Sequence, residues 1–84
     1  MKTIEDFYKY ACENCHLKKW QIEQAWYNVS NRESLPFDVE EQIGDCFDDF
    51  VIDNDIEQSN VTLLENELDY ETAFERISEA QEEL

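Results

Sequence analysis

Three cysteines and a single histidine are the residues of this chain best suited to bind a metal or a cofactor. Residues 12–16 read CENCH, a spacing at which two thiols can attach haem and a histidine can ligate its iron. Together with Cys46, Cys12, Cys15 and His16 also form a Cys3His set of the kind that holds structural zinc. However, the three cysteines fall on apolar helix faces, where cysteine usually packs in the core. We therefore predict core cysteines, no metal site and no cofactor.

Residues 53–57 read DNDIE and begin like the calcium loop of an EF-hand. That loop needs glycine at its sixth position and a bidentate glutamate at its twelfth. Counted from Asp53, these positions hold Gln58 and Leu64, and Glu65 follows one residue too late. We therefore predict no dedicated calcium site in this segment.

Glu33-Ser34-Leu35 lies just before the longest predicted helix. An acidic residue followed by Ser-Leu, in a small acidic helical chain, resembles acyl carrier proteins. The resemblance implies a phosphopantetheine group on Ser34. The glycine that precedes the triplet in that family is replaced by Asn31 or Arg32 here, and Pro36 stands at the usual start of the helix. The alternative is that Ser34 simply ends a turn.

No other residues form a recognisable catalytic set. The chain has one histidine, no nucleophile motif and no glycine-rich phosphate loop. Pairs of carboxylates are frequent among 22 acidic residues, so a single pair carries little information. We predict that the protein is not an enzyme and has no catalytic residues.

The elements that carry these residues are predicted to be helices. One glycine and one proline leave little material for hairpin turns, and apolar residues recur at helical spacing along most of the chain. We predict a single all-α domain, residues 1–84, of four or five short helices. The predicted helices cover residues 4–15, 17–29, about 39–52 and the segment after 69, with helix or a short strand at 61–68.

Two helix starts show capping patterns. Thr3 with Asp6 is predicted to form a capping box at the first helix, and Asp38 with Glu41 a second one at the third helix. Cys12, Cys15 and Cys46 are expected on buried faces. In the last helix, Tyr70 and Leu84 are expected on the same face as Phe74.

Charge is the outlying property of the composition. The net charge is −16, from 22 acidic and six basic residues. Residues 1–32 hold five basic and four acidic residues and sum to +1, whereas residues 33–84 hold eighteen acidic residues and Arg76 and sum to −17. The first part is therefore a near-neutral, aromatic-rich helical hairpin and the second a set of strongly acidic helices. A chain with this charge is expected to be repelled by nucleic acid and by anionic membranes.

Two helices carry acidic rows. At 100° per residue, Glu41, Asp45, Asp48 and Asp49 fall within an arc of about 100°, opposite the apolar face of their helix. They span about 12 Å, or one charge per about 3 Å, close to the charge per 3.4 Å of one DNA strand. A similar row follows the last helix, made of Glu71, Glu75, Glu79, Glu82 and Glu83. Like charges four residues apart destabilise a helix, so each row lowers the stability of the helix that carries it.

This layout predicts an inhibitor that occupies the basic cleft of a nucleic-acid-binding protein or nuclease in place of DNA or RNA. In composition the chain resembles the DNA-mimic inhibitors that phages and mobile elements make against restriction or CRISPR nucleases. We expect Glu41, Asp45, Asp48, Asp49, Glu71, Glu75 and Glu79 to contact the partner. An incidental acidic surface is the simpler reading of the same rows.

The main alternative is a small interaction module, such as an antitoxin-like or adaptor protein, that binds through its aromatic N-terminal part. Trp20, Trp26, Tyr10 and Tyr27 are expected either in the core or on a homodimer face. No apolar run approaches the roughly 18 residues of a membrane span, and no signal-peptide pattern begins the chain. We therefore expect a cytoplasmic protein with reduced cysteines.

Overall fold

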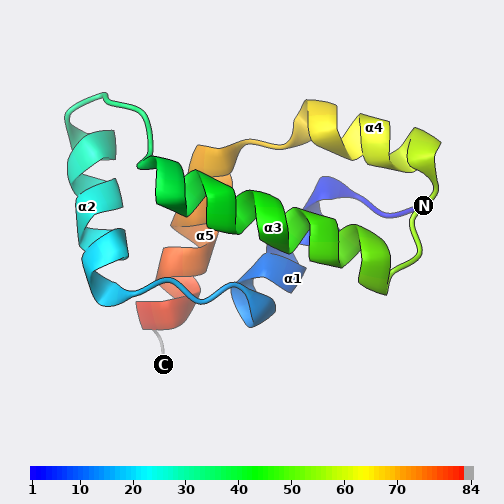
Figure 1. Ribbon diagram of the computed structural model, residues 1–84, viewed down its shortest axis with the longest axis horizontal. Coiled ribbons are helices and arrows are strands. Elements are labelled where there is room, and N and C mark those ends of the chain that lie inside the picture. The colour runs from blue at the N-terminus through cyan, green and yellow to red at the C-terminus, as the bar shows by residue number, and fades with distance from the viewer. Residues whose placement is uncertain (83–84) are drawn as a thin grey trace.

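The computed structural model describes residues 1–82 and contains five α-helices (Figure 1). The helices are α1 (Ile4–Asn14), α2 (Lys19–Ser30), α3 (Phe37–Asp53), α4 (Gln58–Glu67) and α5 (Tyr70–Glu82). No strand occurs within these residues, which confirms the predicted all-α class. Residues 61–67 lie in α4, so helix is the right choice for that segment. Leu84 and Glu83 lie outside the described residues.

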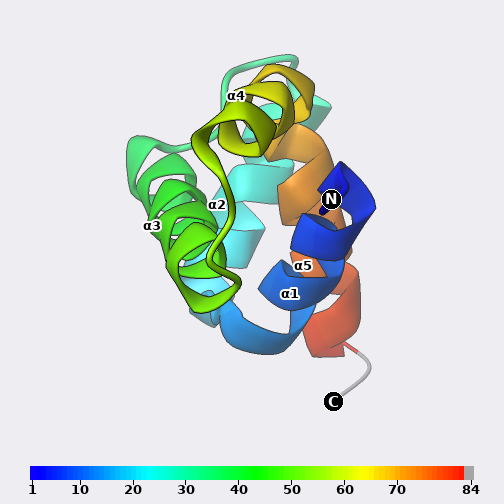
Figure 2. The same ribbon diagram turned by 90° about the vertical axis from the view of Figure 1, so that its right-hand side faces the viewer.

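The helices form two layers. Figure 1 shows α3 crossing in front of α5, and Figure 2 shows α3 on one side of the molecule with α5 and α1 on the other. α1 packs against both α5 and α3, and α5 also packs against α3. The Cα atoms extend 36 × 27 × 17 Å, so the layers make a flat molecule. None of the described helices combines the length and apolar character needed to cross a bilayer.

Phe7 lies at the junction of the two layers and is fully buried. Its ring packs edge-on against Phe47, with centroids 5.2 Å apart, and also contacts Phe50 at 5.6 Å and Tyr8 at 5.9 Å. A second aromatic pair, Trp26 with Phe74 at 5.1 Å, joins α2 to α5. Both aromatic groups come from residues spaced for a helix face, as the sequence pattern predicts.

The first helix starts as predicted. The Thr3 hydroxyl accepts the Asp6 backbone N–H at 3.3 Å, and the Asp6 carboxylate accepts the Thr3 backbone N–H at 2.8 Å. That hydrogen bond from the Thr3 backbone lowers the pKa of the Asp6 carboxyl below its ordinary value. The helix ends one residue earlier than predicted, at Asn14, with Cys15 as its C-cap.

The start of α3 differs from the prediction. Asp38 does not cap the helix: Pro36 is the N-cap, Phe37 is the first helical residue, and the Pro36 carbonyl accepts the N–H groups of Val39 and Glu40. Proline needs no N–H partner and its φ of −55° already suits a helix start. The Asp38 carboxylate instead accepts a hydrogen bond from the Gln21 side chain at 2.9 Å.

The start of α2 also differs, because residue 17 belongs to a tethered linker. The Gln81 side chain accepts the Leu17 N–H at 2.9 Å and donates to the Leu17 carbonyl at 2.8 Å. The second helix therefore begins at Lys19 rather than at residue 17. Gln21 is buried on its inner face, where the sequence pattern predicts apolar residues only.

Two further positions correct the predicted core. Tyr70 is exposed rather than packed with Phe74, and Cys12 is only partly buried. Tyr70 is the first residue of α5, and a Cβ placed on Gly44 of α3 would lie 3.8 Å from the Tyr70 hydroxyl.

Candidate functional site

The cysteine and histidine residues do not converge on one point. Cys15 and Cys46 are both buried, at the end of α1 and in the middle of α3. A hydrogen bond between the two thiols raises the pKa of Cys46, and burial raises it further. The Cys12 thiol instead donates to the Arg76 carbonyl at 3.4 Å, and His16 is exposed. In residues 1–82 no three His, Cys, Asp or Glu side chains are placed to hold a metal ion.

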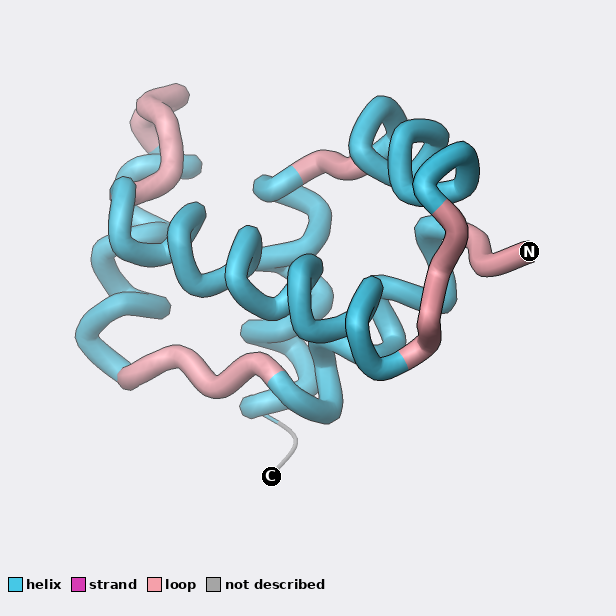
Figure 3. The backbone as a smooth tube through the Cα atoms, turned by 45° about the vertical axis from the view of Figure 1, so that its right-hand side comes forward, coloured by secondary structure: helices cyan, strands magenta, loops and turns pink. Residues whose placement is uncertain are grey.

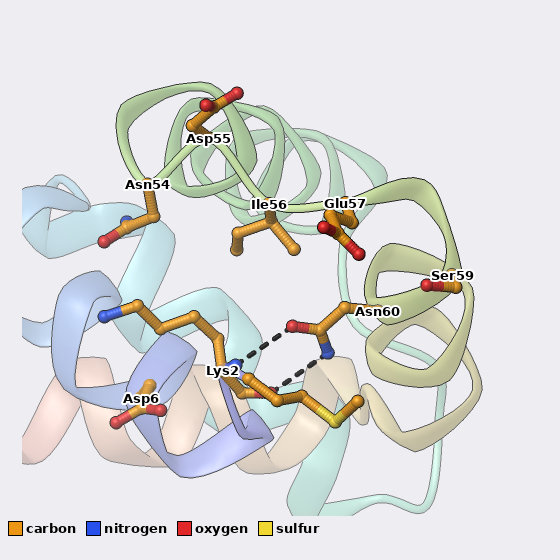
Figure 4. A pocket seen from close by; sticks show the side chains of 9 residues that line it. Lys2, Asp6, Asn54, Asp55, Ile56, Glu57, Ser59 and Asn60 are labelled. Carbon is orange, nitrogen blue, oxygen red and sulfur yellow. Dashed lines mark hydrogen bonds between the residues drawn. The ribbon is translucent and has the colours of Figure 1, made fainter.

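Residues 54–57 border a hollow between the N-terminal segment and the start of α4 (Figure 4). Figure 3 shows the N-terminal segment beside the loop that joins α3 to α4. The Asn60 amide accepts the Lys2 N–H at 2.9 Å and donates to the Lys2 carbonyl at 3.1 Å. Asp53 lies in α3, and its carboxylate accepts a hydrogen bond from the Tyr10 hydroxyl at 2.6 Å. The first carboxylate of the DNDIE segment is therefore used to join α1 to α3.

Ser34 lies in the exposed connection between α2 and α3. Its carbonyl accepts the Asn28 side-chain amide at 3.0 Å, while its hydroxyl makes no protein hydrogen bond among the described residues. Attachment of a phosphopantetheine group at this position stays a prediction from the acyl carrier resemblance.

The acidic row of α3, formed by Glu41, Asp45, Asp48 and Asp49, is exposed along its whole length. The opposite side of the helix is buried and carries Val39, Ile43, Cys46, Phe47 and Phe50. α3 and α4 contain no lysine or arginine. Within residues 1–82 none of the four carboxylates forms an ion pair, since the one ion pair there joins Arg76 to Glu5 at 3.3 Å. The α3 row therefore presents four charges without a basic side chain beside them on the same helix.

The acidic row of α5, formed by Glu71, Glu75, Glu79 and Glu82, has different neighbours. Glu75 is half-buried, whereas the other three are exposed. Glu82 and Lys19 line one hollow between α5 and α2, and Glu71 and Arg32 line another at the other end of the row. Lys19 of α2 and Arg32, which follows α2, thus lie near the two ends of the α5 row.

The two rows do not form one surface. The buried sides of α3 and α5 face each other across the core, so their exposed sides point away from each other (Figures 1 and 2). Figure 1 shows α3 in front of α5, and α5 contacts α2 through Phe74 and Trp26. The structure brings Glu41, Asp45, Asp48 and Asp49 together and keeps Glu71, Glu75 and Glu79 apart from them.

Four large apolar side chains on α2 and α3 are exposed. Trp20 and Tyr27 are 58% and 63% exposed on the outer side of α2, and Phe37 and Ile52 are 78% and 73% exposed on α3. Trp26 and Tyr10, by contrast, are half-buried against the core. The exposure of Phe37 and Ile52 is not part of the sequence prediction, although both lie off the apolar face of the α3 helical wheel.

Comparison of the chain with protein-family models, with curated proteins and with solved structures found no match.

Proposed function

We propose that the protein is an inhibitor that binds the basic, nucleic-acid-binding cleft of another protein through the carboxylates of α3. The partner is a basic DNA- or RNA-binding protein or nuclease, of the kind targeted by anti-restriction and anti-CRISPR proteins of phages and mobile elements. The protein itself has no catalytic role in this proposal. The observation that supports it most is the exposed, unpaired α3 row.

The spacing of the row suits a surface that binds phosphates. From Glu41 to Asp49 the α-helical rise gives about 12 Å for four charges, near the spacing of phosphates on a DNA strand. The buried face behind the row fixes α3 to the core, so the charges are presented by a rigid element. Lysine and arginine side chains arranged for phosphates would meet carboxylates at similar intervals.

The α5 row has a secondary part in this proposal. Glu71, Glu75 and Glu79 lie on the other layer, and the shortest Cα extent of the molecule is 17 Å. A partner that contacts both rows has to reach around the molecule along its shortest dimension. A flat basic surface would contact the α3 row alone.

The test is a competition with DNA. The immobilised protein is incubated with a bacterial lysate at low salt, and bound proteins are eluted with short duplex DNA. We expect basic nucleic-acid-binding proteins in the DNA eluate and little retention at high salt, because exposed charges are screened.

The matched variants are Asp45→Lys with Asp48→Lys on α3 and Glu13→Lys with Glu23→Lys on the exposed sides of α1 and α2. Both pairs change the net charge equally. The proposal requires the α3 pair to lose the DNA-eluted proteins while the control pair retains them. Equal retention by all three proteins would show that the α3 row is not the contact.

A second function, as an adaptor, is favoured by the outer side of α2. Trp20 and Tyr27 are seven residues apart, so they lie on one side of the helix about 10 Å apart. Aromatic side chains exposed together are typical of protein-binding surfaces. An adaptor of this kind would bind its partner at high salt and lose it when Trp20 and Tyr27 are changed to serine. The DNA competition separates the two functions.

A further inference from the structure

Two exposed apolar residues lie at the two ends of the α3 row. Phe37 is the first residue of α3 and Ile52 is its last but one. They are 78% and 73% exposed. They are fifteen positions apart in the helix, which corresponds to about 22 Å along the axis and about 60° around it. Glu41 and Asp48 fall between them in angle and in height, so the row and the two apolar residues share one side of the helix.

The core does not need either side chain. Leu35 is 8% exposed and fills the core just before α3 begins, which leaves Phe37 outside. At the other end, Phe50 is buried and both Val51 and Ile56 pack against the core, which leaves Ile52 outside. Single exposed apolar residues are common on protein surfaces. Two on the same side of one helix, with carboxylates between them, form an ordered pattern.

We propose that the α3 face binds a protein whose basic groove ends in two apolar pockets about 22 Å apart. Phe37 and Ile52 enter the pockets, and the carboxylates between them pair with lysine and arginine side chains of the groove. This inference rests on the proposed function and adds to it. Nucleic acid has no side chains like Phe37 and Ile52, which we call the anchors. A partner with two pockets for the anchors is therefore distinguished from basic clefts that bind charge alone.

The negative charge of the α3 row indicates which class of partner can bind this face. A second copy of this chain would set one acidic row against another, and anionic membranes or nucleic acid would be repelled by the same carboxylates. Apolar anchors combined with unpaired carboxylates fit a protein surface that is both basic and pocketed. Binding should therefore have a salt-sensitive part from the row and a salt-tolerant part from the anchors.

The experiment uses two designed helical peptides as probes. Both carry arginines along one side, and one has leucines about 22 Å apart on that side, whereas the other has glutamines there. Fluorescence anisotropy measures their binding to the full chain at about 0.1 M and about 1 M salt, where the Debye length is about 10 Å and about 3 Å. We expect the leucine peptide to bind about tenfold or more tightly than the glutamine peptide, with a larger ratio at high salt.

Three variants locate the effect. Phe37→Ser with Ile52→Ser should make the two peptides bind equally while leaving the glutamine peptide unaffected. Leu63→Ser, which changes another exposed apolar residue, on α4, should leave the preference intact. Asp45→Lys with Asp48→Lys should weaken both peptides. Circular dichroism verifies that each variant is folded, and the two peptides on the unmodified protein give the same comparison without any substitution.

The outcomes separate the inference from the proposed function. Equal binding of both peptides to the unmodified protein, weakened by the α3 charge reversal, would overturn the anchors and leave the acidic contact standing. Binding that ignores the charge reversal, or no binding at low salt, would overturn both.

Discussion

The acidic rows of α3 and α5 come from similar sequence patterns and meet different surroundings. The α3 row is exposed and has no lysine or arginine on α3 or on α4. The α5 row has one half-buried member, and Lys19 of α2 and Arg32, which follows α2, line hollows at its two ends. Arg76 of α5 is itself paired with Glu5 of α1.

Carboxylate spacing along one helix is therefore not sufficient to define a binding surface. The neighbouring segments decide which basic side chains lie near the carboxylates, and only the fold reveals these neighbours. The α5 row shares its layer with α1 and borders α2, and five of the six basic residues of the chain lie in residues 1–32, which contain these two helices.

The largest effect is expected from removing a buried aromatic contact between α1 and α3. Phe7→Ala deletes a fully buried ring that touches Phe47 and Phe50 of α3 from its place on α1. A loss of about 3–5 kcal/mol in the free energy of unfolding is expected, a large part of the about 5–15 kcal/mol typical of a domain. Urea unfolding followed by circular dichroism measures it, with Leu63→Ala as a surface control. A loss below about 1 kcal/mol would mean that the layers do not depend on this junction.

The next prediction compares the rows directly. Asp45→Lys with Asp48→Lys should weaken binding of the glutamine-containing arginine peptide at least about tenfold at low salt. Glu75→Lys with Glu79→Lys changes the net charge equally and should weaken it less, because the α5 row lies on the opposite layer near basic residues. Anisotropy titrations give both affinities. Equal losses would mean that net charge, and no particular row, governs binding.

A smaller effect concerns the stability of α3 itself. Asp45 has like charges four residues away on both sides, Glu41 and Asp49. Asp45→Asn should therefore raise the free energy of unfolding by a few tenths of a kcal/mol at low salt, and the gain should shrink at high salt. Thr62→Ser, on an exposed site of α4, serves as a control. Destabilisation by Asp45→Asn at both salt concentrations would show that the carboxylate has a structural partner.

The smallest effect at neutral pH involves Tyr10, which joins α1 to the end of α3. Its hydrogen bond to the Asp53 carboxylate, together with burial, raises the pKa of Tyr10 to about 12. Because the folded pKa exceeds the ordinary value of about 10, this stabilisation is complete below pH about 10 and is lost as the pH rises toward about 12. Asp53→Asn should lower the pKa of Tyr10. Absorbance of tyrosinate, with Tyr10→Phe subtracted, measures the titration, and an unchanged midpoint would exclude Asp53 as the cause.

Local features of the fold could be predicted from the sequence. The capping box of Thr3 and Asp6 and the buried face of α3 follow from spacing alone, because both depend on residues within one helix. The exposure of Glu41, Asp45, Asp48 and Asp49 follows from the same periodicity.

Features that depend on two helices could not be predicted. Pro36 rather than Asp38 is the N-cap of α3, and the Asp38 carboxylate accepts a hydrogen bond from Gln21 of α2. The separation of the α3 and α5 rows depends on contacts between helices, such as Phe7 with Phe47 and Trp26 with Phe74. A helical wheel of a single helix does not show such contacts. The exposure of Phe37 and Ile52 could not be predicted either, because it depends on Leu35 and Ile56 packing against the core near the two ends of α3.

Two side-chain amides form hydrogen bonds with backbone groups that are distant in sequence, and these bonds affect how the chain folds. Asn60 holds Lys2 and Gln81 holds Leu17, across sequence separations of 58 and 64 residues. Contacts this distant close large loops and form late. α1 also has its main partner in α5. We expect the first helices to lack these contacts during synthesis until Gln81 has left the ribosome, so that the described residues fold as one cooperative unit.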